Sequence, residues 1–207
     1  FKEQEFLKYC HNYFELEDIT ELINIVEDLK NKEIKSWIFI SNKEFSFADG
    51  FDFLQIHDNL NATYINTLLS DASKLINTIN QIKSFNTFCI VNGLCRNFGL
   101  SMITSFDYVY STSDGETYFE YDLFTKNIFQ FAIELKYLIK KIGIDKTFSL
   151  IFTENIMYPE TAKEIKLIDG TLSKQDIFEY VYNKALNLKH YTKPKSSSII
   201  KSINIFS

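Results

Sequence analysis

Arginine is almost absent from this chain: Arg96 is the only one among 207 residues. Lysine and arginine together number 22 against 27 aspartates and glutamates, which gives a formal net charge of −5. A protein that binds nucleic acid needs a face rich in basic side chains to neutralise phosphates. The composition therefore argues against a nucleic-acid partner.

Cysteine and histidine are also scarce, with three of each. Cys10, Cys89 and Cys95 have no C-x-x-C spacing, and the three histidines are scattered along the sequence, so no recognisable motif of a metal site is formed. We expect no bound metal, and we expect the cysteines to be reduced, with two of them buried.

No run of eighteen apolar residues occurs, and the first residues do not resemble a secretion signal. We therefore expect a cytoplasmic protein with no membrane partner. The length suits one domain with a proper core, and no linker or repeat divides it. Because the chain starts at Phe1 rather than Met, we expect that a preceding segment exists.

The most informative stretch is TFCIVNGLCRNFGLSMITSFD, residues 87–107. Its β-prone beginning, its Asn-Gly pair and its second apolar part predict a buried strand, a turn and a short helix that ends near Asp107. Glycines at positions 93 and 99 let the main chain approach a ligand closely. Forty residues upstream, a predicted strand at residues 37–41 leads into a loop with the sequence FADGFD, residues 47–52.

Together these two stretches resemble the crotonase (enoyl-CoA hydratase/isomerase) superfamily, in which a strand leads to an F-x-x-G-x-D loop and a later strand leads to V-N-G, a glycine-rich turn, a helix and an Asp. The likeness continues through Tyr121 and a segment similar to A-x-x-x-G-L-V at residues 162–168. The resemblance implies an α/β fold, a spiral of ββα units over residues 1–165 with a C-terminal helical region over residues 166–207.

Hydrophobic periodicity and turn residues place the remaining elements. Helices are predicted at residues 17–30, 61–85, 127–142, 146–152, 159–165, 174–188 and 194–206, and extended segments at residues 108–110 and 117–123.

In function, the resemblance implies an oxyanion hole, in which two backbone N–H groups stabilise the enolate or oxyanion of an acyl thioester. Position by position, these donors are the N–H groups of Phe51 and Phe98, although two phenylalanines narrow the pocket. The thioester is carried by coenzyme A or by the phosphopantetheine of an acyl carrier protein, and no cofactor is bound permanently. Asp49 and Phe53 fall near the carrier arm, but Asp49 is equally explained as an acid that caps its loop.

The chain departs from the superfamily at the two glutamates of the hydratases, which correspond here to Ser101 and Tyr121. A serine cannot share a water and its protons as a carboxylate with a raised pKa does. A slip of one residue would bring Glu120 or Asp122 to the second position, although strand alternation turns both away from the side of Tyr121. Tyr121 itself is either an acid toward a leaving group or an aromatic that fills the pocket.

Three further side chains are candidates for a role in the site. Ser101 is a candidate nucleophile without a visible His or Asp partner. His57 either faces the site or lies on a surface loop. Arg96 either reaches a phosphate of the carrier arm or is an exposed, solvated side chain.

One branch of the superfamily, the enzymes of polyketide β-branching, already lacks the first glutamate, and its F-C-T-G-M-D-F loop is similar to residues 47–53. Three hypotheses follow: a lyase of hydratase or dehydratase type, a degenerate protein that binds an acyl carrier or a partner subunit, and, more remotely, a hydrolase or decarboxylase. The resemblance also implies a homotrimer or a hexamer, assembled through the helical tail.

Overall fold

The structure is a computed structural model of the chain. It describes residues 13–43, 45–58, 61–122, 135–153, 156–188 and 199–200, with the backbone alone for residues 53–55 and 199–200. In this part of the chain, no helix is long and apolar enough to cross a membrane.

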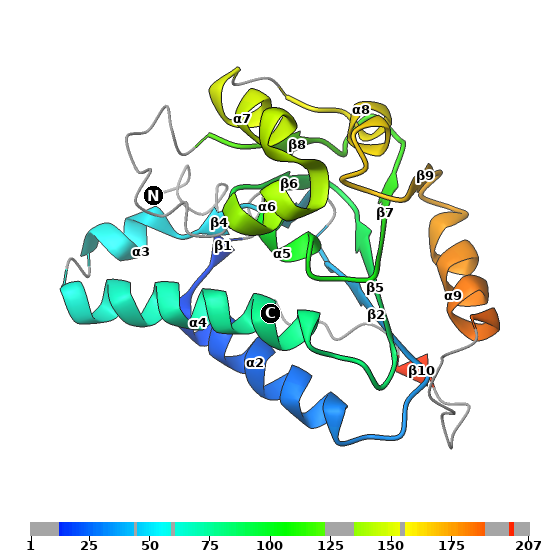
Figure 1. The fold of residues 1–207 in the computed structure, drawn as a ribbon, viewed down its shortest axis with the longest axis horizontal. Helices are drawn as coiled ribbons and strands as arrows, with labels where there is room; N and C mark the ends of the chain where they lie inside the picture. Colours follow the sequence, from blue (N-terminus) through cyan, green and yellow to red (C-terminus); the bar gives the residue numbers. More distant parts are fainter. Residues whose placement is uncertain are drawn as a thin grey trace.

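The chain winds as a spiral in which each long strand is followed by a short strand or pair of strands and then by a helix (Figure 1). The long strands pair with one another in a parallel sheet of order β10-β2-β5-β7-β9, and the short strands form a second parallel sheet of order β3-β6-β8. The strands of the spiral are β2 (Ser36–Ile40), β3 (Ser46–Ala48), β4 (Gly50–Phe51), β5 (Asn86–Val91), β6 (Leu94–Arg96), β7 (Tyr108–Thr112) and β8 (Phe119–Glu120). The predicted α/β fold of ββα units is thus confirmed.

The long strands are apolar on both faces because helices cover both sides of their sheet. In β2, Trp37 and Phe39 point into the main core, whereas Ile38 points to a second apolar cluster on the opposite face. The same alternation occurs in β5, where Cys89 and Ile90 belong to different clusters. This double burial explains why β2 and β5 read as continuous apolar runs.

Helices α2 (Leu16–Lys30) and α4 (Ala62–Asn80) lie side by side against the main core (Figure 1). Their apolar residues recur with helical spacing, and those of the inner face are buried, as the periodicity predicts. The other helices are α3 (Phe53–Asp58), α5 (Phe98–Ile103), α6 (Leu135–Ile142), α7 (Ile144–Phe152), α8 (Pro159–Glu164) and α9 (Ile177–Asn187). Most of the predicted helices are thus confirmed; of the predicted helix at residues 127–142, the part before residue 135 lies outside the described residues.

The region after residue 165 is helical only in part. Helix α9 covers the outer face of the five-stranded sheet through Ile177, Val181 and Ala185. Strand β9 (Gly170–Leu172) pairs with β7, and strand β10 (Ile199–Ile200) pairs with β2. The helix predicted over residues 194–206 is therefore wrong at residues 199–200, and its remainder lies outside the described residues. Short apolar runs do not distinguish a strand from a helix, and two isoleucines suit an edge strand.

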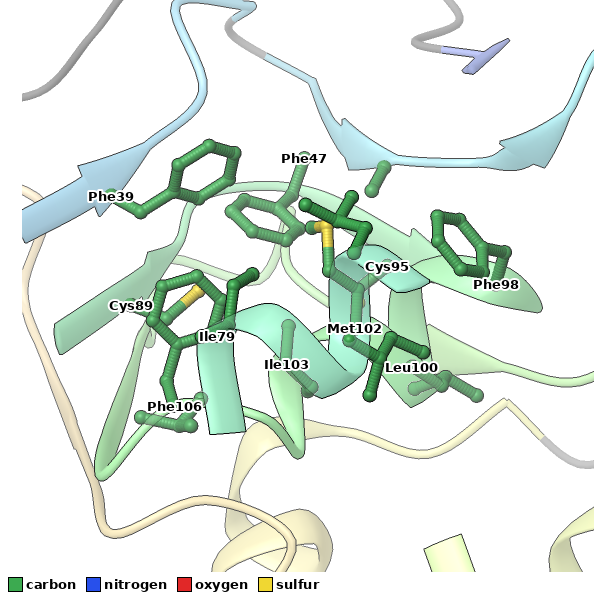
Figure 2. Packing of buried hydrophobic residues seen from close by; sticks show 14 of the residues in the cluster. Phe39, Phe47, Ile79, Cys89, Cys95, Phe98, Leu100, Met102, Ile103 and Phe106 are labelled. Atoms are coloured by element: carbon green, nitrogen blue, oxygen red, sulfur yellow. The ribbon is translucent and has the colours of Figure 1, made fainter. Parts of the chain in front are cut away.

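Helix α5 lies at the centre of the spiral, and all six of its residues are buried. Figure 2 shows its side chains Leu100, Met102 and Ile103 within the apolar cluster that also holds Phe39 and Phe106. A Cβ added at Gly99 would lie 2.6 Å from the carbonyl oxygen of Ala48, so α5 packs directly on the backbone of β3. This contact fixes where the chain enters α5, which is the start of the candidate site.

Candidate active site

The two segments singled out in the sequence meet where β4 passes the start of α5. Gly50 has a φ of +95°, and a Cβ added there would lie 3.5 Å from the amide nitrogen of Phe98 and 3.0 Å from Cβ of Asn97. Only glycine combines this backbone conformation with so close an approach. The peptide that precedes Phe51 therefore lies against the peptide that precedes Phe98.

The side chains of Phe51 and Phe98 also meet. Their rings stack with centroids 4.8 Å apart and planes 19° apart, and Phe14 meets Phe98 edge to face at 5.3 Å. All three rings are buried, so this end of α5 is lined by aromatic carbon. The rings of Phe51 and Phe98 thus fill the space between the two segments.

The N–H of Phe98 is directed away from its own helix. The N–H groups of Leu100 and Ser101 donate to the carbonyl oxygen of Asn97 at 3.0 and 3.4 Å, which closes the first turn of α5. In the part of the chain that the structure describes, the Phe98 N–H has no such acceptor. The first N–H groups of a helix have no partner within it, and this one is available to an oxygen atom of a ligand.

A cluster of charges lies beside this start. The guanidinium of Arg96 is 3.4 Å from the carboxylates of Asp49, Glu120 and Asp122. Burial by itself would lower the pKa of Arg96, but the three carboxylates outweigh it and raise the pKa, so the guanidinium stays charged. The interpretation of Arg96 as an exposed, solvated side chain is wrong, because three carboxylates enclose it.

Three of the remaining predicted site residues are buried. Asp49 is completely buried and accepts from the hydroxyl of Ser46 at 2.9 Å, which suits the loop-capping interpretation. Ser101 is buried within α5. Tyr121 is 3% exposed and belongs to the main apolar core. Phe53 begins α3, but its side chain lies outside the described residues.

His57 and the cysteines behave as simple chemistry predicts. The side chain of His57 is 79% exposed and lies 3.5 Å from Asp58, so His57 is on the surface as one interpretation predicts, but it belongs to helix α3 rather than to a loop. Cys89 and Cys95 are free thiols and buried, as expected; Cys10 lies outside the described residues. No group of three or more His, Cys, Asp or Glu side chains placed to hold a metal ion occurs among the residues described.

Sequence reasoning missed Asn97. This residue adopts a φ of 52° and a ψ of −114°. Its side chain makes two hydrogen bonds with Asp122: Nδ2 of Asn97 donates to Oδ1 of Asp122 at 2.6 Å, and Oδ1 of Asn97 accepts from the backbone N–H of Asp122 at 3.0 Å. The sequence carries only a weak signal for it, since asparagine tolerates positive φ better than most residues. Its partner is 25 positions away, and nothing in the local pattern connects them.

With this geometry in hand, the comparison with known proteins is informative about the fold. No protein-family model matches the sequence, and no curated protein matches it either. Solved structures do match. The chain is similar to an enoyl-CoA hydratase from Bacillus anthracis, with a TM-score of 0.77 and 19% identity over 86% of this chain and 68% of that one.

Two other solved structures give the same result. The enoyl-CoA hydratase from Bacillus halodurans has a TM-score of 0.73 and 20% identity over 85% of this chain and 71% of its own. Human enoyl coenzyme A hydratase domain-containing protein 3 has a TM-score of 0.75 and 16% identity over 82% of this chain and 66% of its own. The chain thus spans about two thirds of the length of these structures.

These likenesses confirm the resemblance predicted from the sequence at the level of the fold: the chain has the fold of the enoyl-CoA hydratase (crotonase) superfamily. At identities of 20% or less these likenesses show the fold alone.

Proposed function

We propose that this chain binds an acyl thioester through the backbone N–H groups of Phe51 and Phe98, and acts on it as a lyase of hydratase or dehydratase type. The thioester is carried by coenzyme A or by the phosphopantetheine of an acyl carrier protein. The observation that carries this proposal is the meeting of the two segments, with Gly50 against the amide nitrogen of Phe98. The crotonase-like fold supports it, since the resemblance of the sequence to that superfamily implies two backbone amides in this role.

Backbone donors tolerate much change in side chains, which is why the proposal survives low identity. A preorganised pair of N–H groups in an apolar, water-poor site stabilises a developing negative charge far better than water does. Phe14, Phe51 and Phe98 supply that apolar lining. The same rings leave little width, so we expect a short or flat acyl group.

Proton transfer has to come from elsewhere than the two usual glutamates. Among the residues at those positions, the hydroxyl of Tyr121 can donate a proton to a leaving group, while Ser101 has no ionisable group in the useful range. Asp122 and Glu120, the carboxylates on either side of Tyr121, both contact Arg96. Tyr121 is therefore the candidate acid of the lyase, and its place in the apolar core suits a site without free water.

A second candidate function is binding without turnover, in which a degenerate crotonase-fold protein holds an acyl carrier or a partner subunit. The stacked rings of Phe51 and Phe98 favour it, because they fill space next to the two amides. So does the burial of Tyr121, since a side chain 3% exposed also serves simply as core. The likeness of residues 47–53 to the polyketide β-branching enzymes suggests a carrier-bound substrate for either function.

Binding and turnover measured together separate these functions. Crotonyl-CoA and 3-hydroxy-3-methylglutaryl groups on CoA and on a carrier protein are incubated with the purified chain. Calorimetry follows binding, and mass spectrometry follows the gain or loss of water. For the lyase we expect turnover that falls at least tenfold in Tyr121→Phe, since a general acid typically contributes about 10²–10⁴-fold.

Tyr118→Phe is the matched control, because Tyr118 is a half-buried tyrosine three positions away, and its turnover should equal that of the wild type. Binding without turnover in the wild type would support the second function. Neither binding nor turnover on any of the three substrates would overturn both.

A further inference from the structure

Asn97 is held in a backbone conformation that asparagine rarely adopts. Its φ of 52° and ψ of −114° correspond to the first central position of a type II′ turn, which glycine dominates. The relaxed positive-φ region for asparagine is the left-handed helical one, with ψ near +47°. Such strained residues persist only where the surrounding structure holds them.

The side chain of Asn97 does not cap helix α5, although Asn97 stands at the N-cap position. Asn97 precedes α5 directly, where an asparagine normally accepts a hydrogen bond from the helix, yet its side chain makes no such bond. Both ends of its amide bind Asp122 instead, at 2.6 and 3.0 Å. Its backbone N–H donates to the carbonyl oxygen of Glu120 at 3.1 Å.

Asp122 is held in place beside Asn97 by an ion pair. Its carboxylate is 13% exposed and lies 3.4 Å from the guanidinium of Arg96. Arg96 is the residue before Asn97, so the ion pair and the amide bonds join the same two short segments side by side. Asp122 therefore binds both Asn97, through hydrogen bonds, and Arg96, through an ion pair.

The conformation of Asn97 decides where the N–H of Phe98 points. If ψ relaxed from −114° to the left-handed value, the peptide between Asn97 and Phe98 would rotate by about 160°. The carbonyl of Asn97 would then take the place of the Phe98 N–H, and an oxyanion would meet an acceptor instead of a donor. The bonds from Leu100 and Ser101 to the Asn97 carbonyl oppose this rotation from the helix side.

We propose that Asp122 is a positioning residue: through its hydrogen bonds to Asn97, it holds the peptide between Asn97 and Phe98 so that the Phe98 N–H faces the thioester oxygen. The inference rests on the proposed function for the role of that N–H. It assigns Asp122 to orientation of the donor, a role distinct from proton transfer.

A pair of ligands isolates the thioester oxygen. Butyryl-CoA carries the carbonyl, and S-butyl-CoA replaces it with CH₂; neither can be hydrated. The ratio of their dissociation constants, measured by calorimetry, reports the interaction with the oxygen alone. We expect the wild type to prefer butyryl-CoA at least tenfold, and Asp122→Ala to lose that preference while its affinity for S-butyl-CoA stays the same.

Three further variants make the test specific to position. Asp122→Asn keeps an acceptor for the Asn97 amide and should retain most of the preference. Asn97→Gly together with Asp122→Ala should restore it, because glycine adopts the required conformation unaided. Glu120→Gln removes another carboxylate from Arg96 without touching the Asn97 side chain, and should keep the wild-type preference.

Retention of the preference in Asp122→Ala would overturn the positioning role and leave the proposed function intact. A wild type without preference would instead overturn the proposed function, and the positioning role is then judged on stability alone. If Asp122 holds Asn97 under strain, Asn97→Gly raises the denaturant midpoint in the Asp122→Ala background but not in the wild type. Equal effects of Asn97→Gly in both backgrounds would refute it.

Discussion

The two buried thiols show how strongly a single residue can depend on its place in this spiral. Cys89 of β5 and Cys95 of β6 are completely buried, and Figure 2 shows both within the apolar cluster around α5. Burial raises the pKa of each thiol well above its usual value, and for Cys95 the neighbouring charge of Asp49 adds to this effect. Both side chains are therefore neutral thiols in the folded protein at neutral pH.

This burial predicts a loss of stability in alkali. Above about pH 9 the thiols ionise in the unfolded chain but not in the folded one, so the unfolded state binds fewer protons and the free energy of unfolding falls. Each thiol contributes up to about 1.4 kcal/mol per pH unit. Urea titrations between pH 8 and 10.5 should therefore show a shallower decline in Cys89→Ala than in the wild type.

The cavity left by Cys89→Ala lowers stability by a similar amount at every pH, so only the slope is diagnostic, and tyrosines and lysines contribute equally to both proteins. Identical slopes would mean that Cys89 also ionises when folded.

Among the single residues of the site, the sequence predicts some and misses others for a physical reason. Phe51 and Phe98 are implied by the resemblance to the crotonase superfamily, whose motifs are short and local in the sequence, and the structure brings their rings together. Asn97 and Asp122 are not, because their interaction depends on a main-chain angle and on a contact between two separate turns of the spiral. Local pattern carries no information about either.

Among the elements, α4 is the longest helix that the structure describes, and its beginning rests on one side chain. The side-chain oxygen of Asn61 accepts from the N–H of Tyr64 at 2.6 Å. Without that bond, this N–H at the helix start would depend on water. Asn61 is exposed, so its effect is local to the helix end.

Replacing Asn61 with alanine should lower the free energy of unfolding by about 1 kcal/mol, because the cap is lost. Asn61→Asp should stay near the wild type, since an aspartate caps equally well. Chemical denaturation monitored by circular dichroism measures both. Equal losses in the two variants would show that the contribution of Asn61 is something other than capping.

Elements with strong periodicity were the predictable ones. Helices α2 and α4 follow from apolar stripes that run for four turns or more, and the structure places both nearly where the stripes do. The sequence predicts a helix that continues to residue 85, whereas α4 ends at Asn80; Ile82 and Phe85 are apolar because they are buried beyond the helix. Burial alone does not keep a chain helical.

For the molecule as a whole, the crotonase fold raises the question of assembly. Helix α9 covers one face of the five-stranded sheet and leaves Tyr180 exposed, while α7 carries an exposed row of Ile144, Phe148 and Phe152 with exposed fractions of 55, 39 and 51%. Large apolar side chains in contiguous exposed rows are unusual on monomers. We keep the prediction made from the sequence, that a trimer or hexamer forms through the tail.

Sedimentation velocity at micromolar concentration should therefore give the mass of three or six chains. A single lysine in the tail, Tyr180→Lys, should reduce that mass, because a charge would be buried in the interface. Phe148→Lys, an equivalent change on α7, should not. A monomeric wild type would contradict the prediction. A lower mass in Phe148→Lys but not in Tyr180→Lys would show that the interface involves α7 and not the tail.

The pairing of β10 with β2 joins a strand made late in synthesis to one made early. Ile199 and Ile200 pair with Ser36 and Trp37, so the edge of the main sheet is completed by residues about 160 positions further along the chain. As the chain emerges from the ribosome, β2, β5 and β7 are made long before β10. During that interval β2 presents an open row of amide and carbonyl groups, which is the kind of edge at which nascent chains join one another. Strand β10 is thus made after the other strands of its sheet, so the edge of β2 at Ser36 and Trp37 stays open until synthesis has passed residue 200.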